Sequence, residues 1–414
     1  MSFRSGRVTC SRFFVLGDAP AMVDEATLGI LSDFTFRETP VGEPDEVEAG
    51  FVTGVHLLDG AFDYDKNGFG DALLFGLRLD THRVPSEIKK AYEAIHRGAA
   101  EAASPTGFAS RAERREAAEL AQRELRDNLA KGLYRRSQMI DVVWDLKRGQ
   151  LLCGATSDKA AEQLIRLMKE AFAVDLQPMS AGAWVGHRMR DKGRGRDYED
   201  LLPTAFTPPP AQARIEHDGA GPTQPIERPL VPWVARAVDV KDWIGNEWLA
   251  WLWWVTETGE GLIDPGDSLL AAEIAITIDK TLDMDCAWDA TGKQTLRGDG
   301  PTRLPEAAEA LREGKWPRKF GLLLSDGEYP WELTLQGDRY TVGSAKLPES
   351  DEAQTPRDII EHRLFVTRRL IDLIDAMFAV FVELRLSGQW PATRSEMQRW
   401  VQQRSNAAMT VEAW

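Results

Sequence analysis

Residues 131–179 read KGLYRRSQMIDVVWDLKRGQLLCGATSDKAAEQLIRLMKEAFAVDLQPM and give the clearest local pattern of the chain. From Ile140 to Lys147, apolar residues alternate with mostly polar ones, which predicts a strand with one core face and one outer polar face. A turn at 147–149 leads to a return strand over 151–155. Ser157 then suits the N-cap of a helix that has one buried stripe, and 174–179 forms another short strand.

The rest of the chain separates runs of strands from runs of helices. We expect strands at 7–17, 51–58, 72–79, 271–279, 284–288, 293–297, 320–325 and 331–336, and helices at 24–31, 85–103, 110–129, 243–255, 305–312, 356–386 and 394–404. This order favours an α+β fold with antiparallel sheets and packed helices over alternating α/β units. We predict a domain over 1–180, a basic and then Pro-rich linker over 181–240, and a second domain over 241–414.

Composition describes an ordinary globular chain with an uneven charge distribution. The 414 residues carry a formal net charge of −15, which by itself argues against binding nucleic acid. However, residues 18–71 contain thirteen acids and two bases, whereas residues 111–136 contain eight bases and five acids. A local positive surface can bind DNA on an acidic protein, because the local potential matters more than the sum. The alternative is that both segments are solvated surfaces without a special role.

Three isolated cysteines, Cys10, Cys153 and Cys286, indicate a reducing compartment rather than a disulfide framework. No segment has the pattern of a signal peptide or a membrane span, so we expect a cytoplasmic protein without a membrane partner. We also expect no cofactor and no metal site. The segment DYDKNGFGD, residues 63–71, resembles the start of a calcium-binding loop, but Leu74 occupies the position of the final glutamate, which favours a polar turn.

The candidate DNA-binding residues fall into two basic segments. They are Arg111, Arg114, Arg115, Arg123, Arg126, Lys131, Arg135 and Arg136 in the first, and Arg188, Arg190, Lys192, Arg194 and Arg196 in the second. Arginines on the 110–129 helix face either a polyanion or, in the alternative, intrahelical acids such as Glu119. The second segment, HRMRDKGRGR at 187–196, predicts a mobile loop that follows phosphates, or simply a solvated loop.

A tryptophan-rich helix opens the second domain. The sequence KDWIGNEWLAWLWWVTETGEG, residues 241–261, is apolar on more than one side. A core helix is the default interpretation. A dimer interface formed by Trp248, Trp251 and Trp254 is the sharper one, because aromatic residues dominate such contacts. Base stacking is a third option, which the acidic flanking residues disfavour.

Parts of the first 180 residues resemble the RdgC family of bacterial recombination-associated proteins. The resemblance rests on VPSEIKKAYEA (84–94), LRDNLAKGLYRRSQ (125–138), IDVVWDLKRGQLLCGATSDKAAEQLIRLMKEAF (140–172) and VDLQPM (174–179). Leu133 stands where the family has an aromatic residue, Arg136 is an additional cation, and the chain is longer than family members and departs from them in its second half.

This resemblance implies a DNA-binding protein that closes as a ring-shaped homodimer around duplex DNA and restrains the RecA-type recombinase. We therefore expect sequence-independent binding to duplex DNA, self-association, nucleoid association and no enzymatic activity. A metal-dependent DNA exonuclease and a structural protein without DNA affinity are the alternatives. No nucleotide-binding or hydrolase motif is present.

Overall fold

A computed structural model describes residues 3–38, 47–210, 213, 228–266 and 273–411, and side chains up to residue 404. The chain divides into two compact units. The first is built from segments 1–14, 150–156 and 177–414, and the second from segments 15–149 and 157–176. The division therefore differs from the predicted boundary at residue 180, because the strands β1 (Val8–Leu16) and β6 (Gln150–Cys153) pair within the first unit.

The second unit contains an antiparallel sheet in the order β5–β4–β2. Its elements are α1 (Glu25–Asp33), β2 (Val47–Val52), α2 (Tyr64–Asn67), β3 (Gly68–Phe69), β4 (Ala72–His82), α3 (Ser86–Ala103), α4 (Arg111–Ala130), β5 (Arg135–Asp145) and α5 (Asp158–Phe172). Trp144 of β5 packs against Phe172 of α5, with ring centroids 5.0 Å apart. Ser157 caps α5 by accepting a hydrogen bond from the amide of Ala160, as predicted.

The predicted outer polar face of β5 is wrong. Asp141 and Asp145 are 2% and 4% exposed, as deeply buried as the apolar residues between them. The alternation of residue types in this strand therefore does not match an alternation of exposure.

The first unit contains a larger antiparallel sheet, in the order β10–β9–β11–β12–β13–β1–β6. Its strands are β1 (Val8–Leu16), β6 (Gln150–Cys153), β7 (Asp175–Pro178), β8 (Leu262–Ile263), β9 (Ile274–Cys286), β10 (Gln294–Gly298), β11 (Lys315–Ser325), β12 (Pro330–Gln336) and β13 (Thr341–Lys346), of which β1 and β7 cross the division between units. Its helices are α6 (Ala181–Asp191), α7 (Gly195–Glu199), η1 (Pro232–Arg236), α8 (Trp243–Thr258), η2 (Pro301–Arg303), α9 (Pro305–Arg312), α10 (Pro356–Arg385) and α11 (Trp390–Val411). The predicted α+β class with antiparallel sheets is confirmed.

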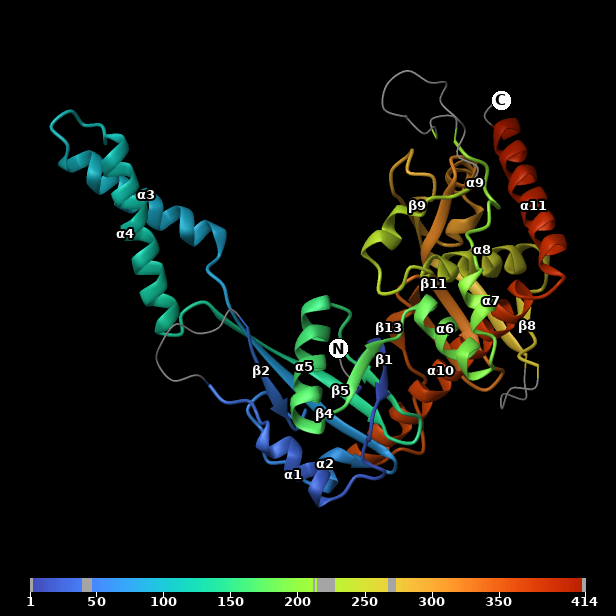
Figure 1. Ribbon diagram of the computed structural model, residues 1–414, viewed down its shortest axis with the longest axis horizontal. Helices are drawn as coiled ribbons and strands as arrows, with labels where there is room; N and C mark the ends of the chain where they lie inside the picture. Colours follow the sequence, from blue (N-terminus) through green and yellow to red (C-terminus); the bar gives the residue numbers. More distant parts are fainter. Residues whose placement is uncertain (1–2, 39–46, 211–212, 214–227, 267–272, 412–414) are drawn as a thin grey trace. The chain divides into compact units, whose positions relative to one another are not determined.

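The core of the first unit lies where α8 and α10 cover the sheet (Figure 1). Along β12, Trp331, Leu333 and Leu335 are buried and alternate with less buried residues. Arg12 of β1 is also buried there. Its two terminal nitrogens each donate to Asp375 of α10 at 2.7 Å, and the Tyr340 hydroxyl donates to the same carboxylate at 2.7 Å. This network ties the first strand of the chain to a helix near its end.

The tryptophan-rich helix α8 is a core element, so the predicted interface is wrong for two of its three residues. Trp248 packs against Phe378, with ring centroids 4.8 Å apart, and Trp251 packs against Phe381 at 5.7 Å. Both are buried within a single chain, because α8 packs against β11 and also contacts α10. Trp254 alone is half-buried.

Candidate nucleic-acid interface

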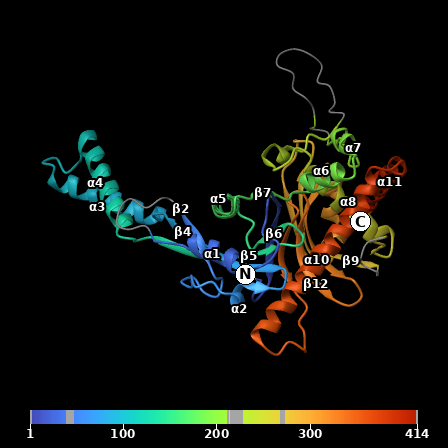
Figure 2. The same ribbon diagram turned by 60° about the horizontal axis from the view of Figure 1, so that its bottom comes forward.

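The helices α3 and α4 form a helical hairpin at the end of the β4–β5 pair. Pairing of these strands continues to His82 opposite Arg135, so the hairpin is inserted where a tight turn would otherwise stand. Figures 1 and 2 show α3 and α4 side by side and antiparallel, beyond the ends of both strands. No residue of α3 is buried, and α4 buries only Ala117, Ala121 and Leu125. Most of the hairpin surface is therefore available to a ligand.

Local interactions hold this exposed hairpin together. Ser110 and Glu113 form a reciprocal capping box at the start of α4, which satisfies two amides that the helix would leave free. Between the helices, His96 and Glu124 lie 2.8 Å apart, and the Asn128 amide donates to the Tyr92 hydroxyl at 3.1 Å. The backbone hydrogen bond of Ser110 lowers the pKa of Glu113, which keeps the cap charged.

Three arginines share one flank of α4. At about 100° per residue, Arg111, Arg115 and Arg126 fall within an arc of about 60° and extend over about 22 Å of the helix axis. We call these residues the arginine flank. Arg123 lies between the flank and the acids Glu116 and Asp127, so positive charge is concentrated on one side of the helix.

Most of the predicted cations of this hairpin remain available. The side chains of Arg111, Arg123, Arg126, Lys131 and Arg136 are exposed and form no ion pair within the described part of the chain. Arg115 pairs with Glu119 at 3.0 Å, but both side chains are largely exposed, so this pair adds little stability and can exchange for a phosphate. Arg114 Nε donates to the carbonyl of Ala109 at 3.0 Å.

Arg135 has a structural role at the base of the hairpin. It pairs with Glu38 at 3.0 Å and lies 3.6 Å from Asp80, which also accepts from Arg78. Burial alone would raise the pKa of Asp80, but hydrogen bonds from Arg78 and Ser137 and the nearby arginine charges outweigh it and lower that pKa. Arg135 is therefore engaged in ion pairs, and its predicted contact with DNA stays a prediction.

The second basic segment is helical rather than a mobile loop, which corrects the prediction for 187–196 and for the start of the predicted linker. It spans the end of α6 and the start of α7 in the first unit, and α6 buries much of its surface. Residues 211–212 and 214–227 of that predicted linker lie outside the described residues. The loop prediction failed because α6 buries apolar residues such as Trp184 and Met189, and Gly193, with a φ of 69°, only separates this helix from α7.

Several cations of this second segment are already neutralised. Lys192 and Arg194 both pair with Glu383 of α10, and the hydrogen bond from Lys192 lowers the pKa of that carboxylate. Arg188 lies over the Trp184 ring at 5.2 Å. Arg190 and Arg196 are exposed and have no carboxylate partner within the described ranges. The segment is therefore a weaker polyanion surface than α4.

The hairpin also exposes apolar residues that the sequence did not single out. Phe108, in the turn between α3 and α4, is 79% exposed, and Ile95 of α3 is 64% exposed. The sequence did carry a signal for the exposure of Phe108, because an aromatic residue there follows Gly107 in the predicted break between two helices. Large contiguous apolar patches mark surfaces that bind a partner, whereas these two residues occupy separate positions of the hairpin.

The calcium-like segment forms a short polar turn, as predicted. Asp63 caps α2 by accepting from the amide of Lys66 at 2.8 Å, and the buried Asn67 amide donates to the carbonyls of Thr53 and Leu74. Among the described residues, no cluster of three or more His, Cys, Asp or Glu side chains is arranged to hold a metal ion. Within the same residues, no helix has the length and apolar content needed to cross a membrane.

Neither a protein-family model nor a curated protein sequence matches this chain.

Proposed function

We propose that this protein binds duplex DNA without sequence specificity, as a nucleoid-associated cytoplasmic homodimer that limits the access of a RecA-type recombinase during homologous recombination. The observation that carries the DNA-binding part is the arginine flank of α4, exposed on a protein with a net charge of −15. The recombination part comes from the sequence resemblance to the RdgC family.

The chemistry of the flank favours contacts to phosphates over contacts to bases. Guanidinium groups bind phosphate oxygens bidentately and stay charged at any physiological pH. The arginine flank extends over about 22 Å of the α4 axis, which is the length of roughly six base pairs of duplex DNA. Because phosphates carry no sequence information, such binding is independent of sequence.

A band-shift titration with duplex DNA at several salt concentrations tests the proposal. The full chain should bind at low salt and lose affinity steeply as salt rises, because binding releases counterions. In the variant Arg111→Gln/Arg115→Gln/Arg126→Gln, the slope of log K against log salt should fall by about 2.7, since each phosphate contact contributes about 0.9.

The matched control removes the same charge elsewhere in the same unit. Lys159, Arg166 and Lys169 are exposed on α5, and their triple exchange to Gln should leave the slope nearly unchanged. Absence of binding at low salt, or equal losses in both triple variants, contradicts the proposal. Magnesium-dependent loss of labelled DNA ends would instead favour an exonuclease.

A further inference from the structure

A carboxylate binds the exposed side of Arg135 at the base of the α3–α4 hairpin. Glu38 Oε1 accepts from a terminal nitrogen of Arg135 at 3.0 Å and from a terminal nitrogen of Arg78 at 3.4 Å. Guanidinium groups bind carboxylate and phosphate oxygens through the same donors. A phosphate can therefore take the place of this carboxylate.

Asp80 holds both arginines in place independently of Glu38. Its carboxylate accepts from Arg78 Nε at 3.0 Å and from a terminal nitrogen of Arg78 at 2.7 Å, and it lies 3.6 Å from Arg135 Nε. The Arg78 guanidinium also lies over the Phe36 ring, 3.9 Å from its centroid. The side chains of Arg78 and Asp80 are 5% and 0% exposed, whereas that of Glu38 is 56% exposed. Glu38 is thus the exchangeable partner, since an exposed ion pair adds little stability.

The charge at the base of the hairpin depends on Glu38. The two arginines and two carboxylates of this group are neutral together, so removal of the Glu38 carboxylate leaves a net positive charge. Lys131, the C-cap residue of α4, and Arg136, the residue after Arg135 on β5, are exposed and form no ion pair within the described part of the chain. Displacing Glu38 therefore adds Arg135 to cations that a polyanion can already reach.

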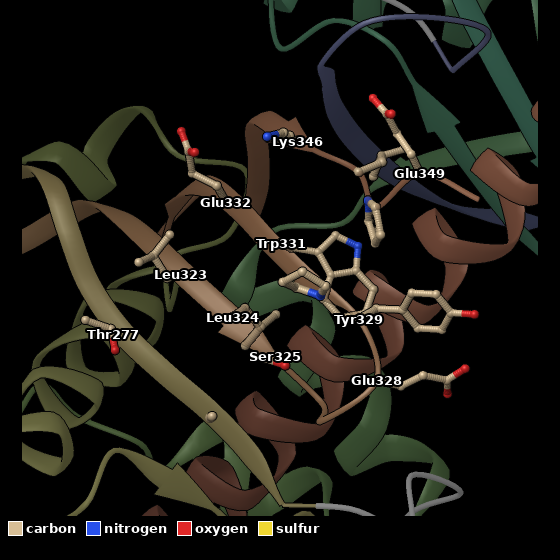
Figure 3. Close-up of a pocket in the computed structure, with 14 residues that line it drawn as sticks. Thr277, Leu323, Leu324, Ser325, Glu328, Tyr329, Trp331, Glu332, Lys346 and Glu349 are labelled. Atoms are coloured by element: carbon tan, nitrogen blue, oxygen red, sulfur yellow. The ribbon is translucent and has the colours of Figure 1, made fainter. Parts of the chain in front are cut away.

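The hollow on the first unit's sheet offers no comparable group (Figure 3). Lys346 is the only cation among the described residues that line it. Two of its glutamates are already paired, Glu332 with Arg7 at 3.0 Å and Glu328 with Arg369 at 2.9 Å. This hollow therefore lacks the neighbouring cations that a phosphate backbone requires.

We propose that Glu38 makes an autoinhibitory contact, in which its carboxylate takes the place of a DNA phosphate on Arg135 and is displaced when DNA binds. This inference rests on the proposed DNA binding and concerns the regulation of the same hairpin. All residues of the contact belong to the second unit.

Band-shift titrations of Glu38→Gln at low salt test this contact on the full chain. The variant keeps the hydrogen-bonding side chain but loses its charge, so duplex DNA should bind about threefold more tightly, as expected from the loss of one exposed competing ion pair. In an Arg135→Gln background the same exchange should have no effect, because the phosphate ligand is gone. Glu170→Gln is the matched control. Glu170 pairs with Arg166 of α5 at 3.0 Å, and its exchange should leave the affinity nearly unchanged.

The outcomes separate this inference from the proposed function. If the parent protein binds DNA and Glu38→Gln binds it no better, the autoinhibitory contact is overturned and DNA binding stands. An equal gain in the Arg135→Gln background also overturns the contact, because Glu38 would then act by general repulsion. So does a clearly lower urea midpoint for Glu38→Gln, which would make Glu38 part of the fold. If neither the parent nor Glu38→Gln binds duplex DNA, both proposals fail.

Discussion

At the scale of single residues, the ion pair between the buried Arg12 and Asp375 joins β1 to α10 in the first unit. Two hydrogen bonds of 2.7 Å join the side chains, and Tyr340 and Gln150 complete the network. Burial raises the pKa of Tyr340, and the charge of Asp375 adds to that rise, so the phenol remains a donor. A charge removed from water in this way is stable only while its partners remain.

Removing one member of that ion pair should lower the free energy of unfolding more than replacing both members with apolar residues. Arg12→Met leaves a carboxylate without its partner and should lower the free energy of unfolding by about 3–5 kcal/mol. Arg12→Met/Asp375→Leu should recover most of this loss, with about 1 kcal/mol remaining because Tyr340 loses its acceptor. Urea denaturation of both variants measures the difference. A double variant as unstable as the single one would show that shape, rather than charge, sets the cost.

Asp242 gives the first unit a pH-dependent stability. Burial raises its pKa to about 6, although the amides of Gly182 and Asp239 donate to its oxygens. The folded state therefore binds a proton more tightly than the unfolded chain, whose pKa is near 3.8. It follows that the free energy of unfolding contributed by this group falls as the pH rises between those two values.

This dependence should be reduced in Asp242→Asn, which cannot titrate. Urea denaturation at several pH values between 4 and 7 gives the slope for each protein, and the slopes are compared because the amide also alters the hydrogen bonds. Equal slopes in the parent and the variant would assign the pH dependence to other groups.

At the scale of elements, the α3–α4 hairpin is an insertion between two strands that already pair. Replacing residues 83–134 with Asn-Gly would join His82 to Arg135 by a two-residue turn of the type that antiparallel strands favour. The remaining chain should fold, because α3 and α4 pack mainly on one another. It should lose the band shift with duplex DNA, since the arginine flank is removed. Undiminished DNA binding by this folded variant would place the interface elsewhere.

At the scale of the whole molecule, self-association and DNA binding should respond to salt in opposite directions. Copies with a net charge of −15 repel one another at low salt, whereas an apolar contact is not screened. Salt should therefore strengthen the proposed homodimer while it weakens DNA binding. Sedimentation velocity at low and high salt measures the first effect and band shifts measure the second.

The exposed turn of the hairpin is the expected contact in that dimer. Phe108→Asp should shift the protein toward monomer, because it places a charge in an apolar contact. Val238→Asp, at another exposed apolar position, serves as the control. A dimer that persists in the Phe108 variant would exclude this turn as the main contact.

Local sequence patterns determined most of the elements and the part of the site that lies on α4. Ser157 was recognisable as an N-cap, and the exposed arginines followed from a helix with few apolar residues. These features depend on residues three or four positions apart, so they can be predicted from the sequence.

Only the tertiary structure decided which of these elements are buried and with which partners. The sequence shows that α8 is apolar on more than one side, but whether Phe378 or a second chain covers it depends on a contact over more than a hundred residues. Tertiary contacts also decided the burial of Asp141, the ion pair between Arg135 and Glu38, and the place of β1 and β6 in the larger sheet. Periodicity records which side of an element is apolar, whereas burial and charge pairing depend on segments that folding brings together from distant parts of the chain.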